Sequence, residues 1–258
     1  MNVLSLFDGM ACARIALDRA GFDVSHYYAS ELDKYAIKVA QENYPSVTHI
    51  GDVCDVQPDN YPNIDLLIGG SPCQGFSIAS GSKRLDFDDP RSKLLFEYVR
   101  ILNVCKPKYF LLENVASMSQ EVKHAIDELV GVSGAVINSD LFVQQNRERV
   151  YWTNIPIAPL PKRPDWVGDF YQWRRNHFRQ NKSNVCPCLT ANMGTGGHNV
   201  PLKSEDLKDK LTPLECERLQ TVPDNYTASV SNTQRYKMLG NGFTVDVIAH
   251  ILKGMRDV

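Results

Sequence analysis

Short apolar runs alternate with amphipathic segments through about the first 150 residues, and no other feature of the chain constrains its fold as strongly. The runs expected to form strands are Val3–Phe7, His26–Ser30, Thr48–Ile50, Asp65–Ile68, Tyr109–Glu113, Ala135–Phe142 and Arg149–Trp152. The segments expected to form helices are Ala11–Ala20, Lys34–Asn43, Ser92–Val104 and Glu121–Val130. A succession of this kind predicts an α/β fold with a doubly wound, parallel-rich sheet that helices cover on both faces.

The alternation stops after Trp152. Prolines then come close together and predict that the chain leaves regular structure, at Pro156, Pro159, Pro161 and Pro164. Helical character returns at Thr212–Glu215, where Thr, Pro and Glu have the order of a helix start, and Val245–Met255 has the pattern of an amphipathic helix. We therefore expect a large domain formed by residues 1–154 and 232–258, interrupted by a small domain and hinge at residues 155–231.

Composition excludes several classes of protein. The 258 residues are 43% hydrophobic and 22% charged, which is ordinary for a soluble globular protein, and no apolar stretch is long enough to cross a membrane. The first residues lack the basic segment of a signal peptide, so we expect a cytoplasmic protein without a targeting signal. The seven cysteines, an odd number, argue against a disulfide framework. Cys186 and Cys188 lack the spacing of a zinc site, so no metal is expected.

A proline–cysteine pair follows one of the apolar runs. The segment Gly69–Ser77 reads Gly-Gly-Ser-Pro-Cys-Gln-Gly-Phe-Ser, so the strand would end in a turn that carries Cys73. The carboxyl end of a strand in an open α/β sheet is where such sheets bind ligands. From these residues alone, Cys73 is either a nucleophile or a buried structural thiol, because free cysteine is also a common core residue.

Acidic residues follow three successive strands. Asp8 precedes the first expected helix, Glu31 ends the second expected strand, and Asp52 ends the third. Acids at such positions can accept hydrogen bonds from ribose hydroxyls or from an adenine amino group. The phosphate-binding glycine pattern of dinucleotide folds is missing, since Ala11 and Cys12 replace glycines. Each acid alone could be a helix cap or a turn residue, but together they predict an adenosine site without a phosphate site.

A basic and aromatic segment lies inside the proline-rich region. Residues 161–182 hold six Lys or Arg against two Asp, interleaved with Trp, Tyr and Phe. Cations can contact phosphates, and aromatic rings can stack on bases. The segment predicts either a nucleic-acid contact or a solvated loop with a small aromatic core, and the net charge of −2 does not distinguish the two.

Taken in order, the motifs of this chain resemble those of the C5-cytosine DNA methyltransferases. The segments that carry the resemblance are Phe7-Asp8-Gly9, Ser30–Ala36, Gly51-Asp52-Val53, Ser71-Pro72-Cys73-Gln74, Glu113-Asn114-Val115, Gln145–Arg149, Leu211–Leu219 and Leu239–Gly242. The resemblance covers nearly the whole chain except about residues 155–184. It implies a Rossmann-like catalytic domain in residues 1–154 and 232–258, with a small inserted target-recognition domain in residues 155–231.

The resemblance also implies a mechanism of methyl transfer. Cys73 would attack C6 of a cytosine flipped out of the duplex, so that C5 can take a methyl group. Glu113 would hold a proton at N3 of the ring, Arg149 would contact O2, and Arg147 would support the catalytic centre. Because Arg147 and Arg149 are separated by one residue on an expected strand, we expect their side chains to point to opposite faces. One would then face the site while the other anchors structure.

The cofactor implied by the resemblance is S-adenosylmethionine, which leaves as S-adenosylhomocysteine. The residues expected to bind it are Phe7, Asp8, Gly9, Met10, Glu31, Leu32, Asp52, Val53, Pro72 and Asn241. The residues expected to contact DNA are Gln74, Ser77, Arg91, Arg174, Arg175, Thr190 and Asn192. Segment 74–91 has the composition of a loop that closes over DNA, or of a connection without that role. We expect a monomer that acts on double-stranded DNA in a bacterial or phage-infected cell, as in restriction–modification, without a membrane partner.

The chain departs from the family pattern at three places. They are Ala11-Cys12, where many bacterial relatives have Gly-Gly, Cys188-Leu189, where Thr-Leu is usual, and Gly242-Phe243, where a small polar residue is common after asparagine. Because the usual threonine is missing, a phosphate contact is expected to be lost or to move to Thr190. None of the three departures removes a catalytic group.

Two rival functions are weighed against DNA methylation. A tRNA-methylating enzyme of the same fold would carry a Cys-Phe-Thr run with paired tyrosines, which this chain lacks. A DNA-binding homologue without activity would not need Cys73, Glu113 and Arg149, which are all present. A Rossmann dehydrogenase is disfavoured by the absent glycine pattern.

Overall fold

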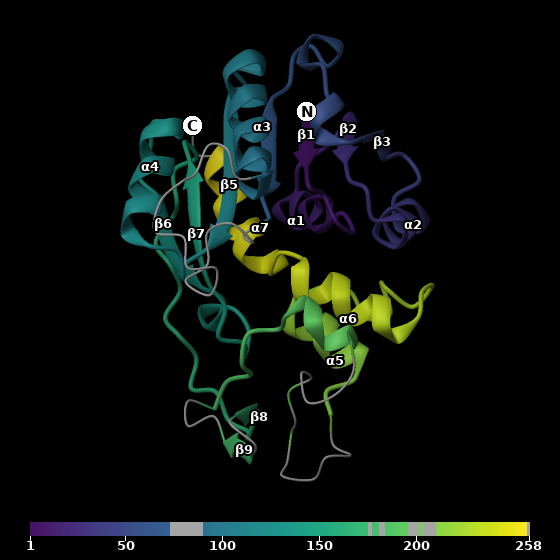
Figure 1. Ribbon diagram of the computed structural model, residues 1–258, viewed down its shortest axis with the longest axis vertical. Coiled ribbons are helices and arrows are strands. Elements are labelled where there is room, and N and C mark those ends of the chain that lie inside the picture. Colours follow the sequence, from purple (N-terminus) through teal and green to yellow (C-terminus); the bar gives the residue numbers. More distant parts are fainter. Residues whose placement is uncertain are drawn as a thin grey trace.

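The computed structural model describes residues 1–72, 90–174, 177–180, 184–195, 201, 203 and 210–256. Within these ranges, side chains are described except at positions 90–92, 172–174, 177–179, 194 and 195. Figure 1 shows an upper lobe built around a sheet and a lower lobe that holds α5, α6 and a short hairpin.

A seven-stranded sheet with the order β3-β2-β1-β4-β5-β7-β6 forms the centre of the upper lobe (Figure 1). Its strands are β1 (Asn2–Leu6), β2 (His26–Ser30), β3 (Thr48–Gly51), β4 (Leu66–Gly70), β5 (Tyr109–Val115), β6 (Ala135–Asn138) and β7 (Glu148–Thr153). Strands β3, β2, β1, β4 and β5 run parallel, whereas β7 is antiparallel to both of its neighbours. The expected doubly wound α/β class is confirmed.

Both faces of the central strands β1, β4 and β5 are buried, since successive residues, which point to opposite sides, are almost all inaccessible to solvent. Leu66 and Ile68 of β4 pack in the core beneath α1, α2 and α7, whereas Leu67 packs in the core beneath α3 and α4. These helices are α1 (Cys12–Ala20), α2 (Lys34–Asn43), α3 (Pro90–Cys105), α4 (Gln120–Val130) and α7 (Val245–Lys253). Burial on both faces explains why the strands form continuous apolar runs in the sequence.

The lower lobe contains short elements that the chain forms after Trp152. They are the antiparallel hairpin of β8 (Tyr171–Arg174) and β9 (His177–Gln180), the 3-10 helix η5 (Ala191–Thr195), and the helices α5 (Pro213–Leu219) and α6 (Asn232–Asn241). The expected helix start at Thr212 is confirmed, since Thr212 and Glu215 form a reciprocal capping box. Helix α6 packs against η5 and α5. Buried residues of α5 and α6 belong to the same core as α1 and α7, so the two lobes share one hydrophobic core.

Some elements differ from the sequence-based expectation. The expected strand Ala135–Phe142 ends at Asn138, because the Asn138 side chain accepts a hydrogen bond from the Asp140 N–H and begins a 3-10 helix. The last helix ends at Lys253 and continues as a 3-10 turn. The 3-10 helices besides η5 are Val53–Asp55, Pro58–Asn60, Ser139–Leu141 and Gly254–Arg256. Helix α6 was not expected, since it buries only Met238, Leu239 and Gly240 and therefore has no extended apolar stripe.

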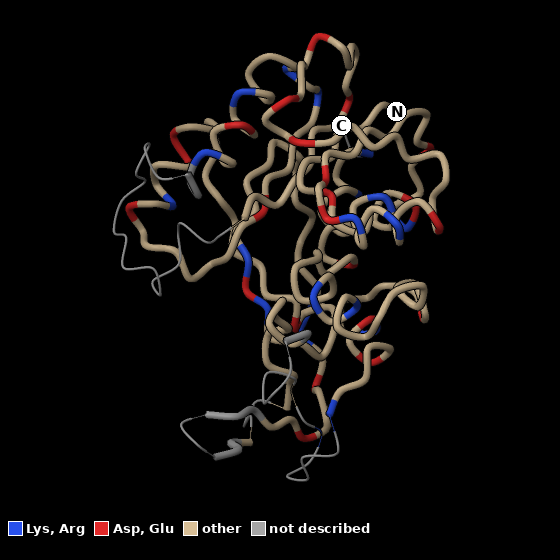
Figure 2. Tube along the Cα trace, turned by 45° about the vertical axis from the view of Figure 1, so that its right-hand side comes forward, with Lys and Arg blue, Asp and Glu red and all other residues tan. Residues whose placement is uncertain are grey.

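Charged residues of both signs are interspersed along both lobes (Figure 2), as expected for a chain with a net charge of −2. Within the described ranges, no helix has the length and apolar character needed to span a membrane.

Candidate active site

Glu31 joins the carboxyl ends of β1 and β2. Its Oε2 accepts a hydrogen bond from the Gly9 N–H at 2.8 Å, and its Oε1 accepts from the N–H groups of Leu32 at 2.7 Å and Asp33 at 2.8 Å. Gly9 has φ +61°, in the left-handed region that glycine adopts without strain, so its N–H can turn toward the carboxylate. The strand ends thus hold a carboxylate at the edge where open α/β sheets bind ligands.

Asp8 is a buried acid directly beside this turn. Its Oδ1 accepts hydrogen bonds from the Ser5 hydroxyl at 2.6 Å and from the Tyr27 hydroxyl. Its Oδ2 is buried, and no described residue supplies it with a partner. Burial raises the pKa of Asp8 to about 7. The two hydrogen bonds lower this pKa, whereas the charge of the neighbouring Glu31 raises it further. One oxygen of Asp8 therefore has hydrogen-bond partners, and the other can carry a proton or accept a hydrogen bond from a ligand.

The remaining residues expected to bind a cofactor occupy three kinds of position. Asp52 caps the 3-10 helix Val53–Asp55 by accepting from the Cys54 N–H at 2.9 Å. Residues buried beneath the strand ends are Met10 and Val53. The residues open to solvent are Leu32, Pro72 and Asn241, and Asn241 is the last residue of α6. Phe7 is partly buried and has a left-handed φ of +56°. The Met10 carbonyl accepts from the Tyr226 hydroxyl at 2.8 Å, which ties this end to the lower lobe.

An ion pair stands at the end of β5, where the sheet changes from parallel to antiparallel. Arg149 of β7 lies with its Nε 3.0 Å from Oε1 of Glu113, and both side chains are largely buried. Gly70 pairs with Glu113 in the register of β4 and β5. A Cβ on Gly70 would lie 3.0 Å from Glu113 Oε2 and 2.9 Å from the ring of Phe243, so a larger residue would crowd the carboxylate.

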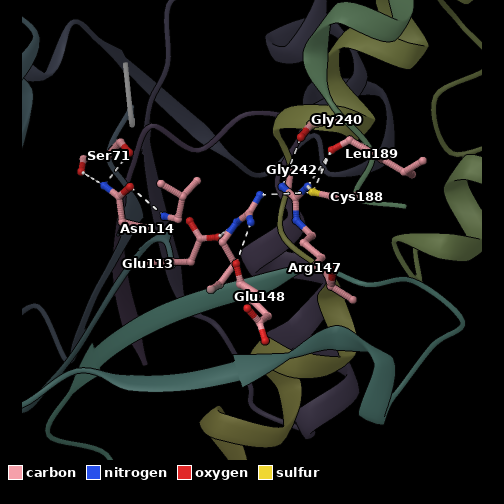
Figure 3. A network of polar contacts seen from close by, with 12 residues as sticks. Ser71, Glu113, Asn114, Arg147, Glu148, Cys188, Leu189, Gly240 and Gly242 are labelled. Carbon is pink, nitrogen blue, oxygen red and sulfur yellow. Dashed lines mark hydrogen bonds and ion pairs between the residues drawn. The ribbon is translucent and has the colours of Figure 1, made fainter. Parts of the chain in front are cut away.

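Asn114 holds the segment that follows β4. Its Nδ2 donates to the carbonyl of Ser71 at 3.2 Å and to the Ser71 hydroxyl at 3.0 Å, and both residues are buried (Figure 3). Ser71 is therefore fixed next to Glu113, two residues before Cys73 in the chain. Cys73 itself, with Gln74, Ser77 and Arg175, lies outside the described residues.

Arg147 anchors two separate segments through three backbone carbonyls. Its guanidinium donates to the carbonyls of Leu189 at 2.9 Å, Gly240 at 3.1 Å and Gly242 at 2.9 Å (Figure 3). The side chain is almost fully buried, and its Nε has no partner among the described residues. Burial and the neighbouring Arg149 lower the pKa of Arg147.

The expectation that Arg147 and Arg149 point to opposite faces is wrong. Both guanidinium groups reach the sulfur of Cys188, Arg147 with Nη1 at 3.4 Å and Arg149 with Nη2 at 3.8 Å (Figure 3). The physical reason is the period of an extended chain, in which side chains two positions apart share a face. Cys188 therefore belongs to the site, although the sequence marked it only as a departure from the family pattern.

A buried amide network lies behind Arg147. Gln145 donates from Nε2 to the Leu219 carbonyl at 2.8 Å and accepts from the Leu189 N–H at 3.0 Å. Gln220 donates to the Leu239 carbonyl at 2.6 Å and to the Gly242 carbonyl at 3.0 Å. Gln145 belongs to the Gln145–Arg149 motif, so the motif was visible in the sequence, but its partners were not.

The residues expected to contact DNA are only partly described. Thr190 and Asn192 are exposed in and beside η5. Helix α6 lies against this segment so closely that a Cβ on Gly240 would stand 2.1 Å from the Thr190 carbonyl carbon. Arg91 lies in α3 and Arg174 in β8, and their side chains are outside the described part. Among the described residues, no cluster of His, Cys, Asp or Glu could hold a metal ion.

The chain is similar in sequence and in fold to known methyltransferases. A family model described as C-5 cytosine-specific DNA methylase matches residues 1–187 and 162–257. The type II methyltransferase M.Bsp6I of Bacillus sp. (strain RFL6) is 31% identical, covering 99% of this chain and 98% of the relative. The orphan methyltransferase M.SPRI of Bacillus phage SPR is 37% identical, covering 97% of this chain and 58% of the relative. The structure of the Entamoeba histolytica methyltransferase EhMeth superposes with a TM-score of 0.74 at 19% identity, covering 100% of this chain and 98% of that one.

Proposed function

We propose, from the premise that this chain belongs to the C-5 cytosine-specific DNA methylase family, that it methylates cytosine by covalent attack of Cys73 on C6. Membership makes it a DNA cytosine-5-methyltransferase, an enzyme that acts on DNA. The methyl donor in this proposal is S-adenosylmethionine, and the sulfur–C6 bond is temporary.

The proposed reaction balances as two linked steps. The Cys73 thiolate forms a bond to C6, and the electron pair that this releases at C5 takes the methyl group. The proton on C5 then leaves, and its electron pair expels the thiolate, which restores the aromatic ring and the enzyme. When bound, S-adenosylmethionine supplies the methyl group on a positively charged sulfur.

The observation that carries the proposal is the buried pair of Glu113 and Arg149 beside the anchored Ser71. Glu113 would hold a proton at N3 of cytosine, which withdraws electrons from C6 and favours attack. Arg149 fixes the Glu113 carboxylate and is available to the O2 of the same ring. Asn114 holds Ser71, and through the chain it sets where the Pro72-Cys73 step begins.

The strand ends of β1 to β3 fit the cofactor that the family implies. Glu31 keeps acceptor capacity beyond its three backbone hydrogen bonds, since a carboxylate offers about four lone-pair sites, and it can accept from ribose hydroxyls. Asp52 would accept from the adenine amino group, and exposed Leu32 with Phe7 would flank the ring. The unpartnered Asp8 Oδ2 offers a further acceptor or donor for the methionine part.

We assign DNA recognition to residues 155–231 and the catalytic domain to residues 1–154 and 232–258. Helix α6 belongs by sequence to the second group and packs on η5 of the first, so it forms the joint between them. The DNA contacts proposed are Gln74, Ser77, Arg91, Arg174, Arg175, Thr190 and Asn192. The enzyme would act as a monomer, in a restriction–modification system or as a solitary bacterial or phage enzyme.

A labelling experiment tests the proposal. The protein is incubated with duplex DNA and S-adenosylmethionine labelled on its methyl group, and the nucleosides are separated. We expect labelled 5-methylcytosine, and a covalent adduct on DNA that contains 5-fluorocytosine, since fluorine cannot leave as a proton does. Cys73→Ala should abolish the adduct while the Cys105→Ala control retains it. Label in N4-methylcytosine or N6-methyladenine, or an adduct that survives Cys73→Ala, would overturn the mechanism.

A further inference from the structure

We propose that Cys188 is a positioning residue for methyl transfer, whose sulfur holds the Arg149 guanidinium against Glu113 by contacting both Arg149 and Arg147. The inference rests on the proposed function, because Glu113 and Arg149 are the groups assigned to the cytosine ring there.

The Arg149 guanidinium has a partner for each of its nitrogens. Nε pairs with Glu113 Oε1 at 3.0 Å, Nη1 donates to the Glu148 carbonyl at 2.8 Å, and Nη2 reaches Cys188 Sγ at 3.8 Å. The Glu148 carbonyl is exposed, and water can compete for it. Cys188 is therefore the partner from the lower lobe that fixes the plane of the guanidinium.

Arg147 supplies the fixed point for this arrangement. Its bonds to the carbonyls of Leu189, Gly240 and Gly242 hold it independently of Arg149. Its Nη1 lies 3.4 Å from Cys188 Sγ, so the sulfur is placed between a rigid arginine and one that pairs with Glu113. The thiol is also 3.4 Å from the Leu189 carbonyl, to which it donates when protonated.

The charges around Cys188 favour its role as an acceptor. Burial would raise the pKa of its thiol, but the two guanidinium groups outweigh burial and lower the pKa. Glu113, Tyr151 and Cys186 are the other titratable groups that interact with this cluster. Because the guanidinium donors are charged, their contacts with the sulfur are charge-assisted, and such contacts are about twice as strong as neutral ones.

The competing explanation is that Cys188 contacts the DNA backbone, as the position of a Thr-Leu pair in the family pattern suggests. The two explanations predict different kinetics. A backbone contact affects the Kd for DNA, whereas a contact that positions Arg149 affects the rate of the chemical step and leaves binding nearly unchanged.

The test compares the full-length variants Cys188→Ala and Cys188→Ser with the wild-type protein and with the Cys105→Ala control. We expect Cys188→Ala to lower kcat about tenfold, the effect of one charge-assisted hydrogen bond, with the Kd for DNA and the KM for S-adenosylmethionine changed less than about twofold. Cys188→Ser should recover part of the rate, because its hydroxyl can accept from the arginines. In an Arg149→Lys background, Cys188→Ala should lower kcat by less than about threefold, since the contact is already lost.

A second measurement does not depend on activity. Iodoacetamide alkylates a thiolate by forming a sulfur–carbon bond as iodide leaves, and the rate at Cys188 can be followed by peptide mass spectrometry at neutral pH. We expect Arg149→Met to slow alkylation at Cys188 about threefold or more, because the thiol pKa rises when a guanidinium is removed. An unchanged rate would show that the contact is absent and would overturn the inference.

The possible failures are distinguishable. If the wild-type protein makes 5-methylcytosine but Cys188→Ala has normal kcat, or only a weaker Kd for DNA, the positioning role is wrong while the proposed function stands. If the wild-type protein makes no 5-methylcytosine, the proposed function is wrong, and the role of Cys188 in that reaction falls with it.

Discussion

The two ends of the site are held together in different ways. At the end proposed to bind the cofactor, called the cofactor end below, Glu31 is fixed by backbone N–H groups that lie no more than 22 positions away in the chain. At the arginine end, Arg147 is fixed to carbonyls that lie 42, 93 and 95 positions away. The first arrangement forms with the parallel sheet itself, whereas the second forms only when the lower lobe docks on β7. Substitutions at the arginine end should therefore lower the free energy of unfolding of the whole protein. Substitutions at the cofactor end should mainly change the pH dependence of stability and the affinity for ligand.

The largest effect is expected from Arg147→Met. The change removes the Arg147 donor from the buried Leu189 and Gly240 carbonyls, while the Gly242 carbonyl keeps its bond from Gln220. We therefore expect the free energy of unfolding to fall by about 4 kcal/mol in a urea titration. Arg163→Met is the matched control, because Arg163 pairs with Asp140 at the surface, and it should cost less than about 1 kcal/mol. Equal losses for the two variants would mean that the lower lobe is held by something other than Arg147.

Gly240→Ala tests the same joint from the side of α6. The added Cβ would stand 2.1 Å from the Thr190 carbonyl carbon, so the helix and the η5 segment must separate. We expect a loss of about 3 kcal/mol in the free energy of unfolding. Gly131→Ala is the control, since nothing lies within 4 Å of its added Cβ and only its positive φ opposes the change, at about 1 kcal/mol. A loss no larger than that of the control would contradict the close approach.

At the cofactor end, Asp8→Asn should change how stability depends on pH. The pKa of Asp8 is raised to about 7, so the folded state binds a proton that the unfolded state releases at lower pH. Its favourable contribution is complete below the unfolded pKa of about 4 and is lost as the pH rises through about 7. Between about pH 5 and pH 8 the wild-type protein should lose about 2–3 kcal/mol relative to Asp8→Asn. Parallel stability curves for the two proteins would show that Asp8 is ionised throughout.

The smallest effect is expected from Lys237→Met, which removes a contact between the two ends. Lys237 of α6 pairs with Asp33 Oδ2 at 2.7 Å, but both side chains are partly exposed. We expect a loss of less than about 1 kcal/mol in the free energy of unfolding. The affinity for S-adenosylmethionine, measured by calorimetry, should change less than about threefold. A larger change would show that the two ends are energetically coupled.

The sequence predicted the elements on either side of Glu31 well, because the contacts that define them are local. Strand His26–Ser30 and helix Lys34–Asn43 have the expected bounds, since apolar periodicity and the Asp33 cap define them. Glu31 therefore had a predictable place at a strand end. The order of the strands near β7 and the docking of α6 depend on contacts between distant segments, which no short pattern encodes.

The arginine pair shows which contacts a sequence motif does not predict. The motif Gln145–Arg149 identifies both arginines. Their shared direction follows from the two-residue period of a strand, which is why the expectation of opposite faces is wrong. Cys188 cannot be linked to them from the sequence, because nothing in positions 147–149 indicates which residue 39 to 41 positions later will lie against them. Its replacement of the usual threonine was the available signal.

The way Arg147 binds also bears on how this fold diversifies. All three oxygens that it contacts belong to the main chain, so the joint does not depend on the side chain at Leu189. Segments between β7 and α5 can therefore change in sequence and length while the arginine keeps its partners, provided that the backbone at Leu189 returns to the same place. A different segment could replace residues between Ile155 and Val185 if it preserved their contacts with Asp140, Gln144 and His250. The glycines at 240 and 242 would be the positions to leave untouched.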